Sequence, residues 1–300
     1  PSAILVLGGS GFLGVHVVHA LQRSGAAVHH ASRRPVLPAR AAPQAIGHEL
    51  DATDLGAVTS LLGALQPALV VLCAAQSRIA DCERDPARAR RLNAELPAVV
   101  ARDAARRGAR LVHVSTDLVF EGRAAAGGYS EDADARPLTE YGRTKLAGED
   151  AVLAECAAAL VVRLPLLYGD SHGRGLGASD ALFDALDRGE TPLLFSDEHR
   201  TPLEASLAAQ WLAALARTEL AGRAHIAGPK RLSRLELARE LLAGDARAER
   251  IAAGTRASAG LEHSRPADVS LACSRALDVC PIEFAGLHEA GLSRVRRRSD

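Results

Sequence analysis

The residues Gly8-Gly9-Ser10-Gly11-Phe12-Leu13-Gly14 form a GxxGxxG pattern near the start of the chain. They lie between an apolar run at residues 3–7, which is typical of a strand, and a helical pattern at residues 12–24. A glycine-rich turn at this position lets the backbone approach a diphosphate at the N-terminus of the helix. The pattern therefore predicts a dinucleotide-binding unit, with a glycine-rich turn that binds no ligand as the alternative.

Short apolar runs alternate with helix-length segments through the whole N-terminal half. Strands this apolar, separated by connections of helix length, indicate a parallel sheet that is buried on both faces. Right-handed crossovers then give a doubly wound parallel (Rossmann) sheet of the α/β class. The candidate strands are residues 3–7, 28–31, 46–50, 68–72, 110–114 and 160–164, and the candidate helices are residues 12–24, 54–65, 86–107 and 138–156.

The regular alternation fades after Pro165. Helical patterns follow at residues 178–188, 204–218 and 233–243, with short strands near 193–195 and 224–226. We therefore expect an NAD(P)-binding Rossmann domain at residues 1–165. A smaller C-terminal substrate-binding lobe is expected at residues 166–300, with part of its chain crossing back to the sheet.

Composition excludes several other classes of protein. The 36 basic and 36 acidic residues cancel, so no net charge favours binding to nucleic acid or to an anionic membrane. The apolar runs fall short of the roughly 20 residues of a membrane span, and the opening run is strand-like rather than a secretory signal. Five scattered cysteines, without CxxC or Cys/His pairing, indicate reduced thiols in a cytoplasmic protein and no metal site.

The residues that follow the second and third strands bear on the choice of cofactor. Ser32 and Arg33 stand where an acidic residue would bind the ribose 2′-hydroxyl of NAD, and they can neutralise the 2′-phosphate of NADP instead. The expected cofactor is thus NADP(H), with NAD(H) as the alternative, because the arginine could also be an ordinary surface charge. Asp51 is assigned to the adenine amino group, and Asp54 to the cap of the next helix.

Tyr141 and Lys145 stand four residues apart in a chain with only three tyrosines. On a helix this spacing places both side chains on one face. The cation is expected to lower the pKa of the phenol, which makes Tyr141 a general acid–base, while Lys145 also reaches the ribose hydroxyls. A hydroxyl of Ser115 or Thr116, just after the fifth strand, could hold the substrate carbonyl oxygen. The alternative for both is an ordinary cap at the end of the strand.

Taken in order, these motifs resemble the extended short-chain dehydrogenase/reductases. Within them the chain is most similar to the dTDP-4-dehydrorhamnose reductases and to their non-catalytic relative, the regulatory beta subunit of methionine adenosyltransferase. The resemblance runs from residue 8 to about residue 280. It rests on segments that include Gly8–Gly14, Asp51-Ala-Thr-Asp54, Val114-Ser-Thr-Asp-Leu-Val-Phe-Glu-Gly122, Tyr141-Gly-Arg-Thr-Lys145 and Arg265-Pro-Ala-Asp-Val-Ser270.

The resemblance assigns roles to particular residues. It implies a catalytic triad of Thr116, Tyr141 and Lys145. The family reductases usually carry Tyr at the position of Leu118, which helps to hold the sugar, and Trp near the position of Leu166. The implied cofactor contacts, besides Ser32 and Arg33, are Gly8, Gly11, Phe12, Leu13, Gly14, Asp51, Ala52, Ala74, Ala75, Tyr141 and Lys145.

These observations predict an NADP(H)-preferring oxidoreductase that reduces a keto group, most consistently that of a nucleotide-linked sugar. One alternative is a cofactor-binding regulatory subunit without turnover, and another is a nucleotide-sugar epimerase. A dehydratase is disfavoured, because it would usually carry an Asp-Glu pair after the catalytic Thr and here Asp117 is followed by Leu118. The expected partner is a small-molecule keto substrate, and the formation of a homodimer is left open.

Overall fold

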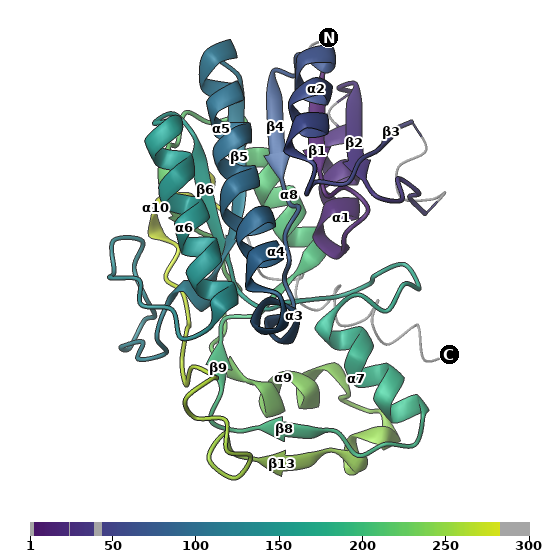
Figure 1. The fold of residues 1–300 in the computed structure, drawn as a ribbon. Helices are drawn as coiled ribbons and strands as arrows, with labels where there is room; N and C mark the ends of the chain where they lie inside the picture. The colour runs from purple at the N-terminus through teal and green to yellow at the C-terminus, as the bar shows by residue number, and fades with distance from the viewer. Residues whose placement is uncertain (1–2, 24, 39–43, 283–300) are drawn as a thin grey trace.

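The computed structural model describes residues 3–23, 25–38 and 44–282, and a seven-stranded parallel sheet lies at its centre (Figure 1). The strand order is β11-β6-β5-β4-β1-β2-β3. The predicted α/β class with a doubly wound parallel sheet is confirmed. The strands are β1 (Ile4–Leu7), β2 (Val28–Ser32), β3 (Ile46–Glu49), β4 (Leu69–Leu72), β5 (Arg110–Thr116), β6 (Leu160–Leu164) and β11 (Gly222–His225).

The central strands are buried on both faces, as their uninterrupted apolar sequences require. In β1, Leu5, Val6 and Leu7 are fully or almost fully buried, and so are Val70 and Leu72 in β4. β1 pairs with β2 on one side and with β4 on the other. The order of the strands thus reverses beside β1, and in open α/β sheets ligands bind in the crevice at the carboxyl ends beside such a reversal.

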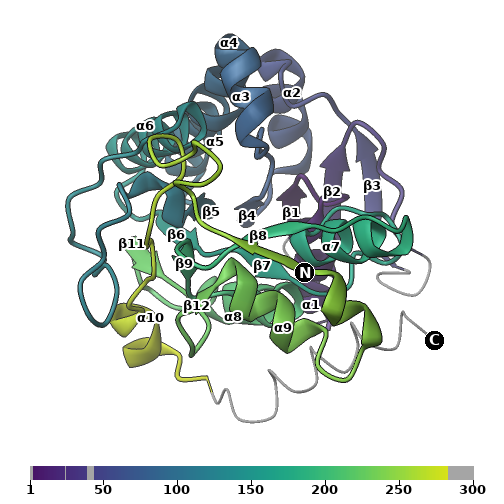
Figure 2. The same ribbon diagram turned by 90° about the horizontal axis from the view of Figure 1, so that it is seen from below.

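Helices cover both faces of the sheet (Figure 2). α1 (Phe12–Gln22) and α8 (Ala205–Leu215) pack on one face, and α2 (Leu55–Leu65), α5 (Leu96–Arg107) and α6 (Glu140–Glu155) on the other. None of the helices in the described ranges is long and apolar enough to span a lipid bilayer. The shorter elements are α3 (Ile79–Arg84), α4 (Pro86–Arg90), α10 (Ser274–Val279), a π-helical turn at Arg91–Glu95, and 3-10 turns at Asp117–Val119 and Ala246–Arg250.

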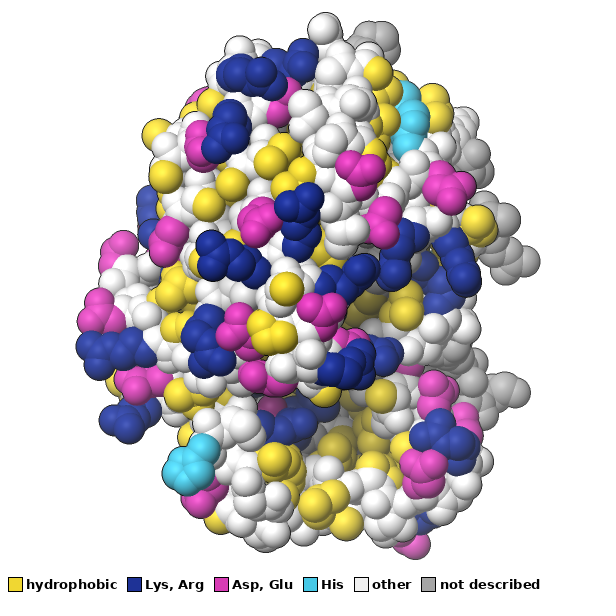
Figure 3. Space-filling view, viewed as in Figure 1, with side chains coloured by type: hydrophobic (Ala, Val, Ile, Leu, Met, Phe, Trp, Pro, Cys, Tyr) yellow, Lys and Arg dark blue, Asp and Glu magenta, His cyan; other side chains and the backbone are white. Residues whose placement is uncertain are grey.

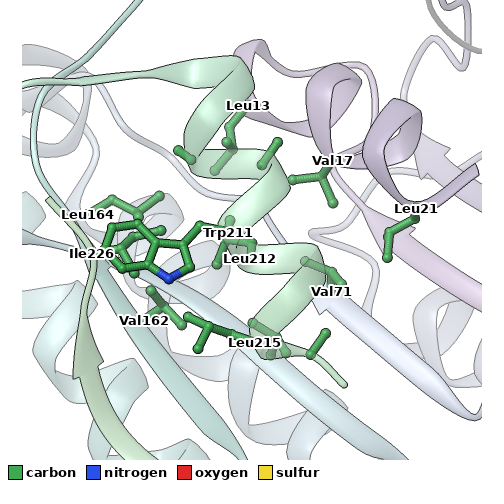
Figure 4. Close-up of a cluster of buried hydrophobic side chains, with 14 of the residues drawn as sticks. Leu13, Val17, Leu21, Val71, Val162, Leu164, Trp211, Leu212, Leu215 and Ile226 are labelled. Carbon is green, nitrogen blue, oxygen red and sulfur yellow. The ribbon is translucent and has the colours of Figure 1, made fainter. Parts of the chain in front are cut away.

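Trp211 of α8 is a fully buried anchor for the face that α1 also covers. Figure 4 shows its indole ring beside Val162, Leu164 and Ile226 of the sheet layer. The indole N–H donates a hydrogen bond to the carbonyl oxygen of Cys280 at 3.1 Å, so the polar edge of the ring is satisfied. Burial of Trp211 therefore attaches α8 to the sheet, even though α8 follows Pro165, in the part of the chain that was expected to form the lobe.

Three segments beyond Pro165 therefore belong to the layers of the sheet, namely α8, the edge strand β11 and α10, whose Ala276 lies in the same core as Trp211. The remaining segments form a smaller lobe below the carboxyl ends of the strands (Figure 1). The division of the chain at residues 165/166 into two domains stays a prediction. The lobe contains α7 (Ala178–Asp187), α9 (Arg234–Leu241), β7 (Leu167–Tyr168), β8 (Leu193–Phe195), β9 (His199–Arg200), β10 (Leu203–Glu204), β12 (Leu232–Ser233) and β13 (Ala252–Gly254).

Candidate active site

A cleft of about 1020 Å³ opens at the carboxyl ends of the strands, and residues of the lobe also line it. Figure 3 shows the molecule hollowed between its upper and lower parts, with Lys and Arg side chains along the rim. The structure brings every site residue predicted from the sequence into this one cleft. They are Gly8, Gly11, Phe12, Leu13, Gly14, Ser32, Arg33, Asp51, Ala52, Ala74, Ala75, Thr116, Tyr141 and Lys145.

The glycine-rich turn has a shape that only glycine allows at two positions. Gly8 has φ +84°, and a Cβ atom there would lie 2.6 Å from the backbone N of Ala74. A Cβ atom on Gly14 would lie 2.1 Å from the carbonyl oxygen of Gly8, so α1 begins directly against the turn. Gly11, the N-cap residue of α1, supplies no side-chain cap. The first N–H groups of α1 thus face a cradle that fits a diphosphate.

The end of β2 carries polar groups that suit an additional phosphate. The Ser32 hydroxyl is buried and has no hydrogen-bond partner among the described residues. Arg33 and Arg34 follow it as exposed side chains that line the same cleft. A buried hydroxyl without a partner carries a free-energy cost that a ligand oxygen would remove. Ser32 and the two guanidinium groups therefore fit the 2′-phosphate of NADP(H).

The two aspartates after β3 have different partners. Asp54 accepts a hydrogen bond from the backbone N–H of Ala57 at 3.0 Å, so the predicted cap of α2 is present. Asp51 accepts from the backbone N–H of Thr53 at 2.9 Å and from its hydroxyl at 2.8 Å, both at Oδ1. The hydrogen bonds from Thr53 hold the pKa of Asp51 below its ordinary value. Asp51 lines the cleft as an ionised acceptor, and its contact with adenine stays a prediction.

The start of α6 places Tyr141 beside the end of β5. The hydroxyl of Thr139 caps this helix by accepting from the backbone N–H of Gly142 at 3.2 Å. A Cβ atom on Gly142 would lie 2.2 Å from the carbonyl oxygen of Leu118, so the glycine allows α6 to approach the residues that follow β5. As a result Tyr141 and Thr116 both line the cleft.

Lys145 lies one helical turn after Tyr141, as the spacing predicts, and its side chain is buried. Its Nζ atom donates to the carbonyl oxygen of Val114 at 2.8 Å and lies 3.3 Å from Nε2 of His113. Burial lowers the pKa of Lys145 to about 8, although the carboxylate of Glu149 acts in the opposite direction. Its ammonium group therefore changes charge close to physiological pH.

The pKa of Tyr141 differs from the expectation. Burial raises the pKa of the phenol above its ordinary value, while the Thr116 hydroxyl and the charge of Arg200 act to lower it. The prediction that Lys145 brings this pKa toward working pH is thus wrong for the protein alone. The physical reason is that desolvation of the phenolate dominates, and that the Lys145 ammonium donates to the end of β5. Tyr141 is consequently a protonated phenol, ready to donate.

The two hydroxyls at the end of β5 have different surroundings. Ser115 donates to Oε1 of Glu149 at 2.6 Å, so its proton is already used within the protein. Thr116 donates to Oδ1 of Asp117 at 3.1 Å. It also accepts from the backbone N–H of Leu118 at 3.2 Å, which is the cap considered as the alternative role. Asp117 is itself buried and accepts from Nη1 of Arg200 through both carboxylate oxygens at 2.8 Å. Thr116 is therefore held in place by a buried ion pair with the lobe.

The sequence predicted no role for the polar residues behind the cleft. Asn93 lies in the π-helical turn and is fully buried. Its amide accepts from the backbone N–H of Gln76 at 2.9 Å and donates to the Thr144 hydroxyl at 3.1 Å. A Cβ atom on Gly148 would lie 2.0 Å from the carbonyl oxygen of Asn93. No role was predicted for Glu149 either, although its place four residues after Lys145 puts it on the same helix face and could have indicated one.

Two departures from the family pattern fall outside the cleft lining. Leu118 is buried, and Leu166 packs against the hydrophobic core of the lobe. Neither residue is among those that line the cleft. Within the described part of the chain, no group of three His, Cys, Asp or Glu side chains could hold a metal ion.

A doubly wound sheet with a glycine-rich turn at its strand reversal defines a Rossmann-type fold, and its cleft also contains the Tyr141/Lys145 pair. The chain belongs to the RmlD substrate binding domain family, whose sequence model matches residues 2–290. This is a family of NAD(P)-dependent sugar-nucleotide reductases.

Three curated relatives illustrate the range of the family. A probable low-salt glycan biosynthesis reductase, Agl14, from Haloferax volcanii is 32% identical and is matched over 80% of each chain. A dTDP-4-dehydrorhamnose reductase from Streptomyces griseus is 39% identical over 73% of this chain and 67% of its own. Methionine adenosyltransferase 2 subunit beta from Xenopus tropicalis is 40% identical over 45% of this chain and 40% of its own.

A solved structure supports the same fold. The dTDP-4-dehydrorhamnose reductase of Bacillus anthracis, in complex with NADP, superposes with a TM-score of 0.81 over 99% of both chains. The two sequences are 22% identical, so the likeness is one of fold.

Proposed function

We propose that this protein is an NADP(H)-preferring reductase that reduces a keto group on a nucleotide-linked sugar. The observation that carries the proposal is the shared cleft of Thr116, Tyr141 and Lys145 beside the glycine-rich turn. The substrate class is supported by the relatives whose names specify reductases of dTDP-linked sugars. The free thiols of all five cysteines support a reducing, cytoplasmic compartment. A homodimer stays a prediction.

The side chains of the cleft divide the chemistry among them. When bound, reduced nicotinamide supplies the hydride. Tyr141 donates its phenol proton to the carbonyl oxygen of the substrate, as a general acid. When substrate binds, the Thr116 hydroxyl turns its proton from Asp117 to that oxygen and so orients it against the phenol. Lys145 holds the ribose hydroxyls, and its positive charge stabilises the phenolate that forms after the proton leaves.

The activity is tested with purified protein, NADPH and a panel of nucleotide-linked keto sugars, by following the loss of NADPH absorbance. We expect turnover on at least one of them. Because Leu118 and Leu166 supply neither the polar group nor the aromatic surface that relatives carry at these positions, and neither lines the cleft, we expect poor activity on dTDP-4-dehydrorhamnose. A kcat/KM near 10⁶ M⁻¹s⁻¹ on that sugar, which many ordinary enzymes reach, would contradict the expectation.

A second candidate function is a cofactor-binding subunit without turnover. It is favoured by the similarity to methionine adenosyltransferase 2 subunit beta and by the altered residues at Leu118 and Leu166. Tight NADPH binding without oxidation of NADPH by any keto sugar in the panel would support this alternative. Turnover that depends on Tyr141 would exclude it.

The cofactor preference is tested by Arg33→Asp. The wild type is expected to bind NADPH at least about tenfold more tightly than NADH, since a charge-assisted phosphate contact contributes about 1.5–3 kcal/mol. Arg33→Asp should reverse the order, because a carboxylate repels the 2′-phosphate and accepts from a 2′-hydroxyl. Fluorescence titration measures both affinities. Arg136→Asp, at an exposed arginine outside the cleft, is the control. Equal affinities in the wild type would refute the preference.

A further inference from the structure

The loop at residues 169–177, which connects β7 to α7 of the lobe, lies across the start of α1. Nε2 of His16 donates to the carbonyl oxygen of Asp170 at 2.8 Å. The ring of His172 lies against the ring of His16, with 5.2 Å between their centroids. A Cβ atom on Gly177 would lie 2.9 Å from Cζ of Phe12, so the end of the loop packs directly on the glycine-rich turn. The lobe thus contacts the glycine-rich turn and the start of α1 through this loop.

Arg174 is the residue of this loop whose side chain donates hydrogen bonds to the glycine-rich turn. Its Nη1 atom donates to the carbonyl oxygen of Ser10, and Nη2 donates to that of Gly11 at 3.5 Å. Nε donates to the carbonyl oxygen of Ser171, within the loop, at 3.0 Å. Ser10 and Gly11 both line the cleft. The guanidinium group therefore lies at the edge of the cleft, beside turn residues that line it.

Arg174 has no ion-pair partner in the described part of the chain, although the carboxylates of Asp170 and Asp180 act on its charge from a greater distance. Among the residues that the structure describes, no carboxylate lies within ion-pair distance of Arg174, whereas the lobe residues Arg247 and Arg265 each pair with a carboxylate. The partners of Arg174 are neutral carbonyl oxygens, and the side chain is partly buried. A partly desolvated cation beside an anion cradle attracts an anion more strongly than an exposed one does.

We propose that Arg174 binds the diphosphate of the cofactor from the lobe side of the cleft, beside the glycine-rich turn. The inference rests on the proposed function, and it adds a cofactor ligand that comes from the lobe rather than from the Rossmann sheet. The diphosphate is common to NADP(H) and NAD(H), whereas Arg33 meets a group that only NADP(H) carries. Arg174 and Arg33 therefore make separable contributions to affinity.

The test is a calorimetric titration of wild-type protein and Arg174→Gln with NADPH, NADH, ADP and AMP. We expect Arg174→Gln to weaken NADPH, NADH and ADP by a similar factor of about tenfold or more, the size of a lost charge-assisted contact. AMP has no diphosphate, so its affinity should stay nearly unchanged. Arg250→Gln is the matched control, because Arg250 also donates to two backbone carbonyls, those of Leu186 and Glu190, and these partners do not line the cleft as Ser10 and Gly11 do.

The possible outcomes separate this inference from the proposed function. If Arg174→Gln binds ADP and both dinucleotides as the wild type does, the assignment of Arg174 is wrong and the proposed function stands. An equal loss for AMP would also overturn it, since Arg174 would then only support the shape of the site. If the wild type binds ADP through Arg174 but neither dinucleotide, the diphosphate contact stands and the proposed function fails. If the protein binds none of the four ligands, both the assignment of Arg174 and the proposed function are wrong.

Discussion

Tyr141→Phe is expected to lower the turnover of a keto substrate by about 10²–10⁴, the range for a lost general acid. The phenol is the proton donor of the proposed reaction, and burial keeps it protonated at neutral pH. The ring that packs at the start of α6 remains in the variant, so NADPH affinity should stay close to that of the wild type. Steady-state kinetics and a fluorescence titration with NADPH measure the two quantities separately.

Tyr129→Phe is the matched control for this substitution. Its hydroxyl accepts from the backbone N–H of Arg123 at 2.7 Å, and its ring stacks on Phe120 outside the cleft. The control removes the same atom from a tyrosine of the same chain, and turnover should persist. If Tyr141→Phe turns over the substrate at the wild-type rate, Tyr141 is not the proton donor and the mechanism is wrong.

The sequence predicted those parts of the site that are local in the chain. The segment Gly8–Gly14 specifies a turn and the helix that follows it, and its fold depends on glycine at fixed positions. Tyr141 and Lys145 share a helix face whatever packs around them. Each of the six predicted strands in the N-terminal half overlaps an observed strand. Short apolar runs that alternate with helices are typical of the buried strands of a doubly wound sheet.

Contacts between distant residues could not be predicted in this way. Asp117 meets Arg200 across 83 positions, and Arg174 meets Ser10 across 164. The prediction of a lowered pKa for Tyr141 is wrong for a related reason. The sequence shows the neighbouring charge of Lys145 but not the burial of the phenol, which outweighs it. Packing between residues far apart in the chain decides these features, and that packing cannot be predicted from one sequence without the fold.

Glu149→Ala is expected to destabilise the fold by about 3–5 kcal/mol, as breaking a buried ion pair does. The carboxylate is fully buried on α6. It accepts from Nη2 of Arg163 at 2.7 Å, from Nε of Arg223 at 2.9 Å and from the hydroxyl of Ser115 at 2.6 Å. Its removal leaves the buried Arg163 without its carboxylate. Equilibrium unfolding in urea, compared with that of the wild type, measures the loss.

Two further variants make this result interpretable. The double variant Glu149→Leu with Arg163→Met should recover most of the loss, because apolar side chains of similar size tolerate the site once both charges are gone. Glu155→Ala removes a carboxylate of the same helix that pairs with the exposed Arg102, and it should shift the unfolding midpoint little.

The stabilisation by Glu149 should also depend on pH in a defined direction. Burial acts to raise the pKa of Glu149, but the hydrogen bonds and charge of Arg163, with Ser115 and Arg223, outweigh it and hold the pKa below its ordinary value. A carboxylate with a lowered pKa stabilises the folded state above the pKa of the unfolded chain and ceases to do so as pH falls through the folded-state value. The stability difference between wild type and Glu149→Ala should therefore shrink on acidification below about pH 4.5. If Glu149→Ala costs no more than Glu155→Ala at neutral pH, the network does not hold α6, and with it Lys145 and Tyr141, against β5 and β6.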